Sequence, residues 1–178
     1  MRAPRSRRIA AEIMSIEPVD VLTGIAIGMG ATLIMDAWNL FLKRMFSIQS
    51  LNLCWLGRWI GHMPRGTFTH ANIAAAERKP FECALGWLAH YATGVTLALA
   101  FVALASGWRV RPTLLPALFF GIITVVFPFF VLQPSLGLGV ASSRAPNPTQ
   151  ARLKSLMTHS VFGLGLFLSG LAMRYLVR

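Results

Sequence analysis

Long apolar stretches alternate with shorter polar segments along the 178-residue chain. Four of these stretches are about as long as the roughly 20 residues that an α-helix needs to cross the hydrocarbon core of a bilayer. They run over residues 19–42, 83–105, 113–132 and 155–173. The pattern predicts an all-α integral membrane protein, folded as a four-helix up-and-down bundle.

The first connection between these stretches, residues 43–82, contains a shorter helical pattern. Trp55 and Trp59 lie four residues apart on one side of a helix, and Arg58 and His62 lie four apart on another. A helix with aromatic rings on one face and cations on the other is typical of the headgroup region of a membrane. We therefore expect a short interfacial helix in connection one.

A basic arm, residues 1–18, precedes the membrane domain, which covers residues 19–178. The arm resembles the start of a secretory signal, but the apolar run after it is longer than a signal core of roughly 7 to 15 residues. We expect no cleavage. Met14 is an alternative translation start to Met1, and the arm is either disordered or an extension of the true start.

Each span carries a stripe of small and polar residues at helical spacing, as helix packing in lipid requires. Packing within the chain is the expected use of these stripes. Gly24 and Gly28 also have the spacing of a seam between two copies, so a homo-oligomer through these glycines is an alternative.

Two further patterns predict local structure in the third and fourth spans. Pro116 and Pro128 predict a kink in the third span, because proline lacks the N–H that continues a helix. Asn147, Pro148 and Gln150 suit the cap, the first turn and the third position of a helix, so the fourth helix is expected to begin there.

The composition supports membrane residence, because 55% of the residues are hydrophobic and only 13% are charged. The net charge of +11 comes from basic residues at the borders of the spans. We interpret these residues as contacts with anionic lipids rather than with nucleic acid, since no nucleic-acid-binding motif accompanies them.

The orientation prediction rests on the same basic residues, because Lys and Arg near span ends favour the cytoplasm. Connections one and three hold nine of them: Lys43, Arg44, Arg58, Arg65, Arg78, Lys79, Arg144, Arg152 and Lys154. The opposite side holds four if translation begins at Met14 and eight if it begins at Met1. The count favours the cytoplasm for connections one and three.

The two cysteines, Cys54 and Cys83, show neither paired spacing nor a metal-ligand pattern. We interpret them as free thiols.

Three spans each carry one titratable residue: Asp36, His90 and His159. At about 1.5 Å per residue, an up-and-down path places them roughly 9, 10 and 6 Å inside the face that connections one and three share. A charged group inside hydrocarbon is costly and marks a candidate functional site. The three side chains suit a two-His, one-carboxylate metal site, a proton relay, a substrate contact or a hydrogen bond that only locks helices together.

Further polar residues border the same face. Connection three begins too apolar for a free loop, so we expect it to dip back towards the membrane. The candidates for ligand binding or for a polar core are Asp36, Arg58, His62, Arg65, His70, Glu82, His90, Gln133, Arg144, Arg152 and His159.

Several short motifs resemble an uncharacterised family of bacterial membrane proteins, domain of unknown function 2938. They are residues 36–38 (DAW), 57–66 (GRWIGHMPRG), 86–91 (GWLAHY), 133–137 (QPSLG) and 146–148 (PNP), together with His159. The resemblance covers about residues 18–176. It implies a bacterial inner-membrane protein with four helices, and it implies no activity.

Three functions fit these observations, and whether the protein is an enzyme stays open. The first is a polar pocket at one membrane face that binds a small anionic or lipid ligand. The second is a membrane oxidoreductase that holds a divalent metal or a haem at Asp36, His90 and His159. The third is a structural or assembly role, with the polar residues holding helices together.

Overall fold

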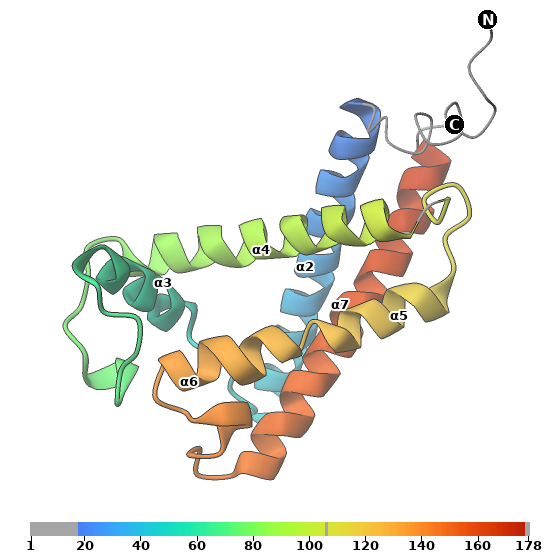
Figure 1. Ribbon diagram of the computed structural model, residues 1–178. Helices are drawn as coiled ribbons and strands as arrows, with labels where there is room; N and C mark the ends of the chain where they lie inside the picture. The colour runs from blue at the N-terminus through green and yellow to red at the C-terminus, as the bar shows by residue number, and fades with distance from the viewer. Residues whose placement is uncertain (1–17, 106, 177–178) are drawn as a thin grey trace, which may run out of the picture.

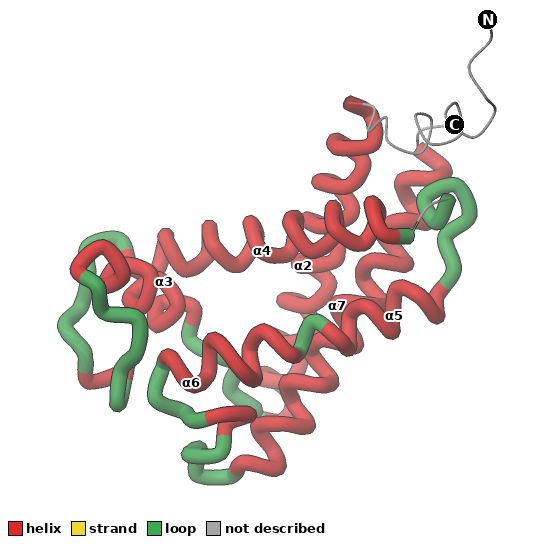
Figure 2. The backbone as a smooth tube through the Cα atoms, in the orientation of Figure 1, coloured by secondary structure: helices red, strands yellow, loops and turns green. Residues whose placement is uncertain are grey.

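The computed structural model describes residues 18–105 and 107–176 of the chain, and all regular structure in these ranges is helical (Figure 2). The three longest helices are α2 (Pro18–Phe46), α4 (Glu82–Leu104) and α7 (Pro148–Leu176). The third apolar stretch of the sequence, Leu114–Ser135, is also helical and long enough to cross a membrane, although it is not one continuous helix. The predicted all-α class is therefore confirmed, and four helical segments are long and apolar enough to cross a membrane.

The third span is interrupted, as its prolines predict. It consists of α5 (Leu114–Ile123), a π-helical turn η3 (Pro128–Leu132) and α6 (Gln133–Ser135). Residues 124 and 125 form a turn between α5 and the π-helical segment. Pro128 opens that segment, where its missing N–H removes one backbone hydrogen bond.

The fourth helix begins where its capping residues place it. The backbone N–H of Gln150 donates to Asn147 Oδ1 at 3.2 Å, and α7 starts at Pro148. This bond satisfies one of the free N–H groups of the first turn.

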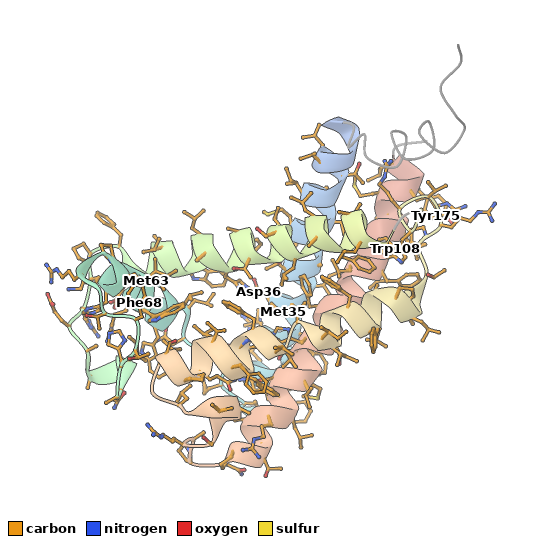
Figure 3. The ribbon with its side chains drawn as sticks, in the orientation of Figure 1. Met35, Asp36, Met63, Phe68, Trp108 and Tyr175 are labelled. Carbon is orange, nitrogen blue, oxygen red and sulfur yellow. A yellow bond between two sulfur atoms is a disulfide. The ribbon has the colours of Figure 1, made fainter. Side chains whose placement is uncertain are left out.

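The long helices make two crossing pairs around a central contact. Helices α2 and α7 run side by side, α4 lies across α2, and α5 lies across α7 (Figure 1). Figure 3 shows Met63 and Phe68 at one end of the molecule and Trp108 and Tyr175 at the other. All four helices contribute to one buried cluster: Ile27, Ala31, Ala98, Phe101, Trp108, Ala117, Phe162 and Leu166.

Small residues permit these close crossings. A Cβ atom on Gly28 would lie 2.6 Å from the Cα of Val95, and one on Gly24 would overlap the side chain of Leu99. Both glycines thus face α4 of the same chain. They serve the intrachain packing, and a homo-oligomer would need another surface than the predicted Gly24 and Gly28 seam.

Many large apolar side chains point outward along all four spans, among them Leu22, Leu88, Leu115 and Phe119, each at least 67% exposed. Apolar surface of this extent is unfavourable in water and is suited to lipid. The apolar outer surface and the lengths of the helices therefore both favour a membrane environment.

Connections one and three pack against each other. Connection one contains α3 (Leu53–His62), η1 (Met63–Arg65) and η2 (Ile73–Ala75), and connection three contains η4 (Val140–Ser142). The N–H groups of His70 and Ile73 donate to the carbonyls of Ser135 and Leu136, at 2.9 and 3.1 Å. A second buried cluster joins the same segments: Trp59, Ile73, Leu132 and Leu136. The two connections therefore lie on the same side of the molecule.

Helix α3 crosses the first turns of α4 at very short range. A Cβ on Gly57 would overlap the carbonyl oxygen of Glu82, and one on Gly86 would overlap that of Leu53. Cys54 and Cys83 form a disulfide at this crossing. The free-thiol interpretation was therefore wrong, because the fold brings together two helices whose cysteines are 29 residues apart.

The crossing predicts that Gly57→Ala costs more than about 3 kcal/mol of unfolding free energy, the upper end of ordinary overpacking costs. The new methyl group would press on the backbone of α4, which cannot rotate away as a side chain can. Thermal unfolding of the detergent-purified protein measures the loss. Gly61→Ala is the matched control one turn along α3, because its Cβ would meet only side-chain carbons of Lys79 at 3.0 and 3.1 Å. Equal melting temperatures for the two variants would contradict the close crossing.

Candidate functional site

Asp36 and His90 form a polar pair between α2 and α4. Figure 3 shows Asp36 away from both ends of α2. His90 Nε2 lies 3.0 Å from Asp36 Oδ1. An ionised carboxylate can only accept, so Nε2 must carry the proton in that state. The side chains are 20% and 16% exposed, so part of each stays accessible.

The second carboxylate oxygen of Asp36 is buried and has no hydrogen-bond partner. Such an atom is an acceptor without a donor, which is unfavourable in a low-dielectric environment. The Tyr91 side chain interacts with Asp36 through a side-chain hydrogen bond as well as through charge. The rings of Trp87 and Tyr91 lie 6.0 and 5.6 Å from that of His90. The pair is thus flanked by aromatic rings, with the Tyr91 hydroxyl nearby and no donor in hydrogen-bond geometry at Oδ2 of Asp36.

His159 is held from the opposite side of the helix cluster. Its Nδ1 lies 2.7 Å from the hydroxyl oxygen of Thr124, and that hydroxyl donates to the carbonyl of Gly121. Because the single hydroxyl proton is used there, Nδ1 must donate to Thr124. Nε2 of a neutral His159 therefore keeps a free lone pair.

The three predicted residues are neighbours without forming one cluster of ligands. His90 acts electrostatically on His159, whereas direct hydrogen bonds join Asp36 to His90 and Thr124 to His159. Within residues 18–105 and 107–176, no three His, Cys, Asp or Glu side chains are placed to hold one metal ion. The predicted metal site stays a prediction.

Two other polar contacts extend this layer across the helices. The Thr158 hydroxyl donates to Asn39 Oδ1 at 3.4 Å between α7 and α2. Gln133 Nε2 donates to the Ser155 hydroxyl at 3.3 Å, and Gln133 Oε1 is buried without a partner. We call these residues, with Asp36, His90, Thr124 and His159, the polar layer.

Arg58 is the most extensively bonded side chain of connection one. Its Nε and Nη2 donate to the two carboxylate oxygens of Glu82, each at 2.8 Å. Its Nη1 donates to three backbone carbonyls at 3.0 to 3.2 Å, those of Ile73, Ala74 and Ala76. The hydrogen bonds with Glu82 raise the pKa of Arg58 above its ordinary value. Arg58 is 4% exposed and holds the loop around η2, so it is not free to bind an anionic ligand.

The other predicted cations are engaged differently. Arg65 lies 3.5 Å from Glu77 on the surface, with both side chains mostly exposed. Arg152 donates to the carbonyl of Ala141 at 2.8 Å. Arg144 is exposed in connection three. The structure does not gather these arginines around Asp36 as a single pocket wall.

His62 and His70 form a separate pair in connection one, with ring centroids 4.9 Å apart. His62 Nε2 lies 3.0 Å from the carbonyl of Glu77. Both ring nitrogens of His70 are buried without partners. Burial, followed by the proximity of His62, lowers the pKa of His70 below 6.5.

An apolar recess also lies on the outer face of α2, near the end that faces connection one. Its lining residues are Ala37, Leu40, Phe41, Arg44 and Met45. It is open and lies on one helix, and it does not include the Asp36 and His90 pair.

Sequence reasoning missed several partners in the polar layer. Thr124, Asn39 and Thr158 were not singled out as partners of the titratable residues, because the sequence does not show which faces of the helices meet. The cysteine pair carried a signal that could have found it. Each cysteine stands three residues before a glycine, in Cys54-Trp-Leu-Gly57 and Cys83-Ala-Leu-Gly86. Residues three apart lie on the same helix face, so each cysteine shares a face with a glycine that permits close packing.

The model of one protein family matches residues 25–173 of the chain, and its description reads "Protein of unknown function (DUF2938)". No curated protein and no solved structure matches the chain.

The low pKa of His70 predicts an acid-sensitive connection one. The unfolded chain binds a proton near pH 6.5 and the folded chain only at lower pH, so this contribution to stability is complete above pH 6.5. It is lost as the pH falls through the folded pKa. Melting temperatures of the purified protein between pH 8 and pH 5 measure the slope.

The matched variant is His70→Phe, which keeps an aromatic ring against His62 and removes the titrating group. We expect a shallower acid-side slope in this variant. An unchanged slope would show that His70 does not carry the pH dependence.

Proposed function

The chain belongs to the DUF2938 family of proteins of unknown function, and from this premise we propose a multi-pass inner-membrane protein of bacteria that binds a lipid headgroup. In this proposal the four apolar helices cross the bilayer alternately up and down. Helix α3 lies in the interface on the side of connections one and three. The headgroup binds at the Asp36 and His90 pair.

The four spans and the packing of the two connections support this topology. Connections one and three can contact each other only if α2 and α5–α6 end, and α4 and α7 begin, on one side. Trp59 in α3 donates its indole N–H to the carbonyl of Phe68, which keeps that polar edge bonded at the interface.

The observation that carries the ligand proposal is the unpartnered, buried Oδ2 of Asp36 beside an accessible His90. The contact with His90 uses one carboxylate oxygen. No donor, the Tyr91 hydroxyl included, meets the second oxygen in hydrogen-bond geometry, although Tyr91 interacts with the carboxylate. A ligand N–H or O–H would complete the acceptor. We therefore favour a headgroup that carries an ammonium or hydroxyl group.

The arginines contribute less to this site than the sequence predicts. Arg58 is fully used by Glu82 and backbone carbonyls, and Arg152 by Ala141. Recognition of an anion alone would depend on exposed groups such as Arg144. The Asp36 carboxylate, which lacks a donor at Oδ2, is therefore a stronger basis for ligand recognition than the arginines.

The test compares two zwitterionic lipids that differ in the required donor. Phosphatidylethanolamine has ammonium N–H groups, and phosphatidylcholine has none. Native mass spectrometry of protein exchanged into equal mixtures should show several-fold preference for phosphatidylethanolamine in the wild type. Asp36→Asn should abolish the preference, because it removes the charge and turns part of the acceptor into a donor.

Thr158→Val is the control, because it breaks another interhelical hydrogen bond of the polar layer without touching Asp36. It should lose stability of about 1 kcal/mol and keep the lipid preference. Equal retention of both lipids by the wild type, or a preference that survives Asp36→Asn, would contradict the proposal.

A metal- or haem-dependent oxidoreductase is the second candidate. What supports it is the free lone pair on His159 Nε2 and the neighbouring His90. Metal analysis and the absorption spectrum of purified protein test it. This candidate predicts a stoichiometric metal or a haem absorption band in the wild type, and His159→Gln should remove it while the protein stays folded. Purified wild type with neither a metal nor a haem band would contradict it.

A further inference from the structure

The Cys54–Cys83 disulfide bears on the side of the membrane that connections one and three occupy. Protein disulfides form and persist in oxidising compartments, whereas the cytoplasm keeps thiols reduced. The bond therefore contains information on orientation that basic-residue counts do not. We infer that connections one and three lie on the extracytoplasmic side, opposite to the side that the charge count favours.

The bond sits where an external oxidant can reach it. Cys54 and Cys83 are each the second residue of a helix, and both helices start at the face of connection one. Cys83 is exposed and Cys54 is half-buried. Closing the bond removes one proton from each thiol and passes two electrons to a disulfide-bearing oxidant, which becomes a dithiol.

The charge count gives a small margin for this chain, because it is nine against eight if translation begins at Met1. The fold adds that some of the nine residues are engaged within connection one. Three of the nine basic residues of connections one and three lie against carboxylates. Arg58 is paired with Glu82, and Arg65 and Lys79 both contact Glu77. Arg58 is moreover buried within its loop, so it presents little charge to a membrane.

Connection three follows connection one to the same side. The bonds from His70 to Ser135 and from Ile73 to Leu136 join the two segments directly. In addition, the Lys154 ammonium in α7 donates to the carbonyl of Gln49 in connection one. Both ends of the chain then lie in the cytoplasm, and the basic arm of residues 1–18 lies on the side that Lys and Arg prefer.

One consequence concerns the polar layer, which lies nearer this face than the other. Groups that reach Asp36 from water would come from the extracytoplasmic side. The inference itself rests on the disulfide and the loop packing, and it holds or fails independently of the proposed lipid site.

The first experiment determines orientation on the intact chain expressed in a bacterial inner membrane. Fusions of a fluorescent protein and of alkaline phosphatase to Arg178 report the side of the C-terminus without changing the membrane domain. Bright fluorescence with inactive phosphatase is expected, because the C-terminus lies in the cytoplasm. Active phosphatase with a dark fluorescent fusion would overturn the inference.

The second experiment determines the state of the only two cysteines in the sequence. Intact cells are treated with a membrane-permeant maleimide, and the lysed sample is then reduced and labelled with a maleimide carrying a large polymer. Two mobility shifts are expected, because both thiols are protected in the disulfide. Cys83→Ser, which leaves one blockable thiol, is the control and should show none. A wild type without shifts has free thiols, and this result would overturn the inference.

Discussion

Hydrocarbon offers no water to a polar group, so each polar side chain in the four spans must find its partner within the protein. The polar layer follows from this constraint. Asp36 pairs with His90, Thr124 with His159, and Asn39 with Thr158, and each pair joins two different spans. Two buried oxygens of the layer have no hydrogen-bond partner, Oδ2 of Asp36 and Oε1 of Gln133, and the carboxylate oxygen is the more costly because it carries charge.

The same constraint governs connection one, which packs against the ends of the apolar helices. The carbonyls around η2 would lack partners if the loop were placed on an apolar surface, and the guanidinium of Arg58 supplies three of the hydrogen bonds they need. Glu82 balances the charge of Arg58 from the first turn of α4. The disulfide and the close contact at Gly57 and Gly86 then fix α3 on α4. Connection one is therefore held in one position against the apolar helices.

The sequence predicts the features that depend on local chemistry. Span lengths follow from hydropathy, the start of α7 follows from Asn147, and the break in the third span follows from proline. The depth argument also brought Asp36 and His90 to one level, because rise per residue is nearly constant in helices.

Features that depend on how the helices rotate and cross were beyond the sequence. His159 could have faced Asp36, but the close contact of Gly163 with Ala117 and Leu118 turns that face of α7 towards α5, where Thr124 lies. The cysteines looked unrelated because 29 residues separate them and only the crossing of α3 and α4 joins them. Arg58 looked like a ligand-binding residue because its partner Glu82 comes from another helix.

In the proposed site, His90 donates to Asp36 between α2 and α4, and one carboxylate oxygen remains for a ligand. Solid-state nitrogen NMR of histidine-labelled protein in bilayers tests it most directly, with the His90 signal assigned by its loss in His90→Gln. We expect a His90 ring protonated at Nε2 whose shift changes in Asp36→Asn, while the His159 signal keeps its Nδ1–H form. A His90 spectrum indifferent to Asp36→Asn would contradict the pairing and the site built on it.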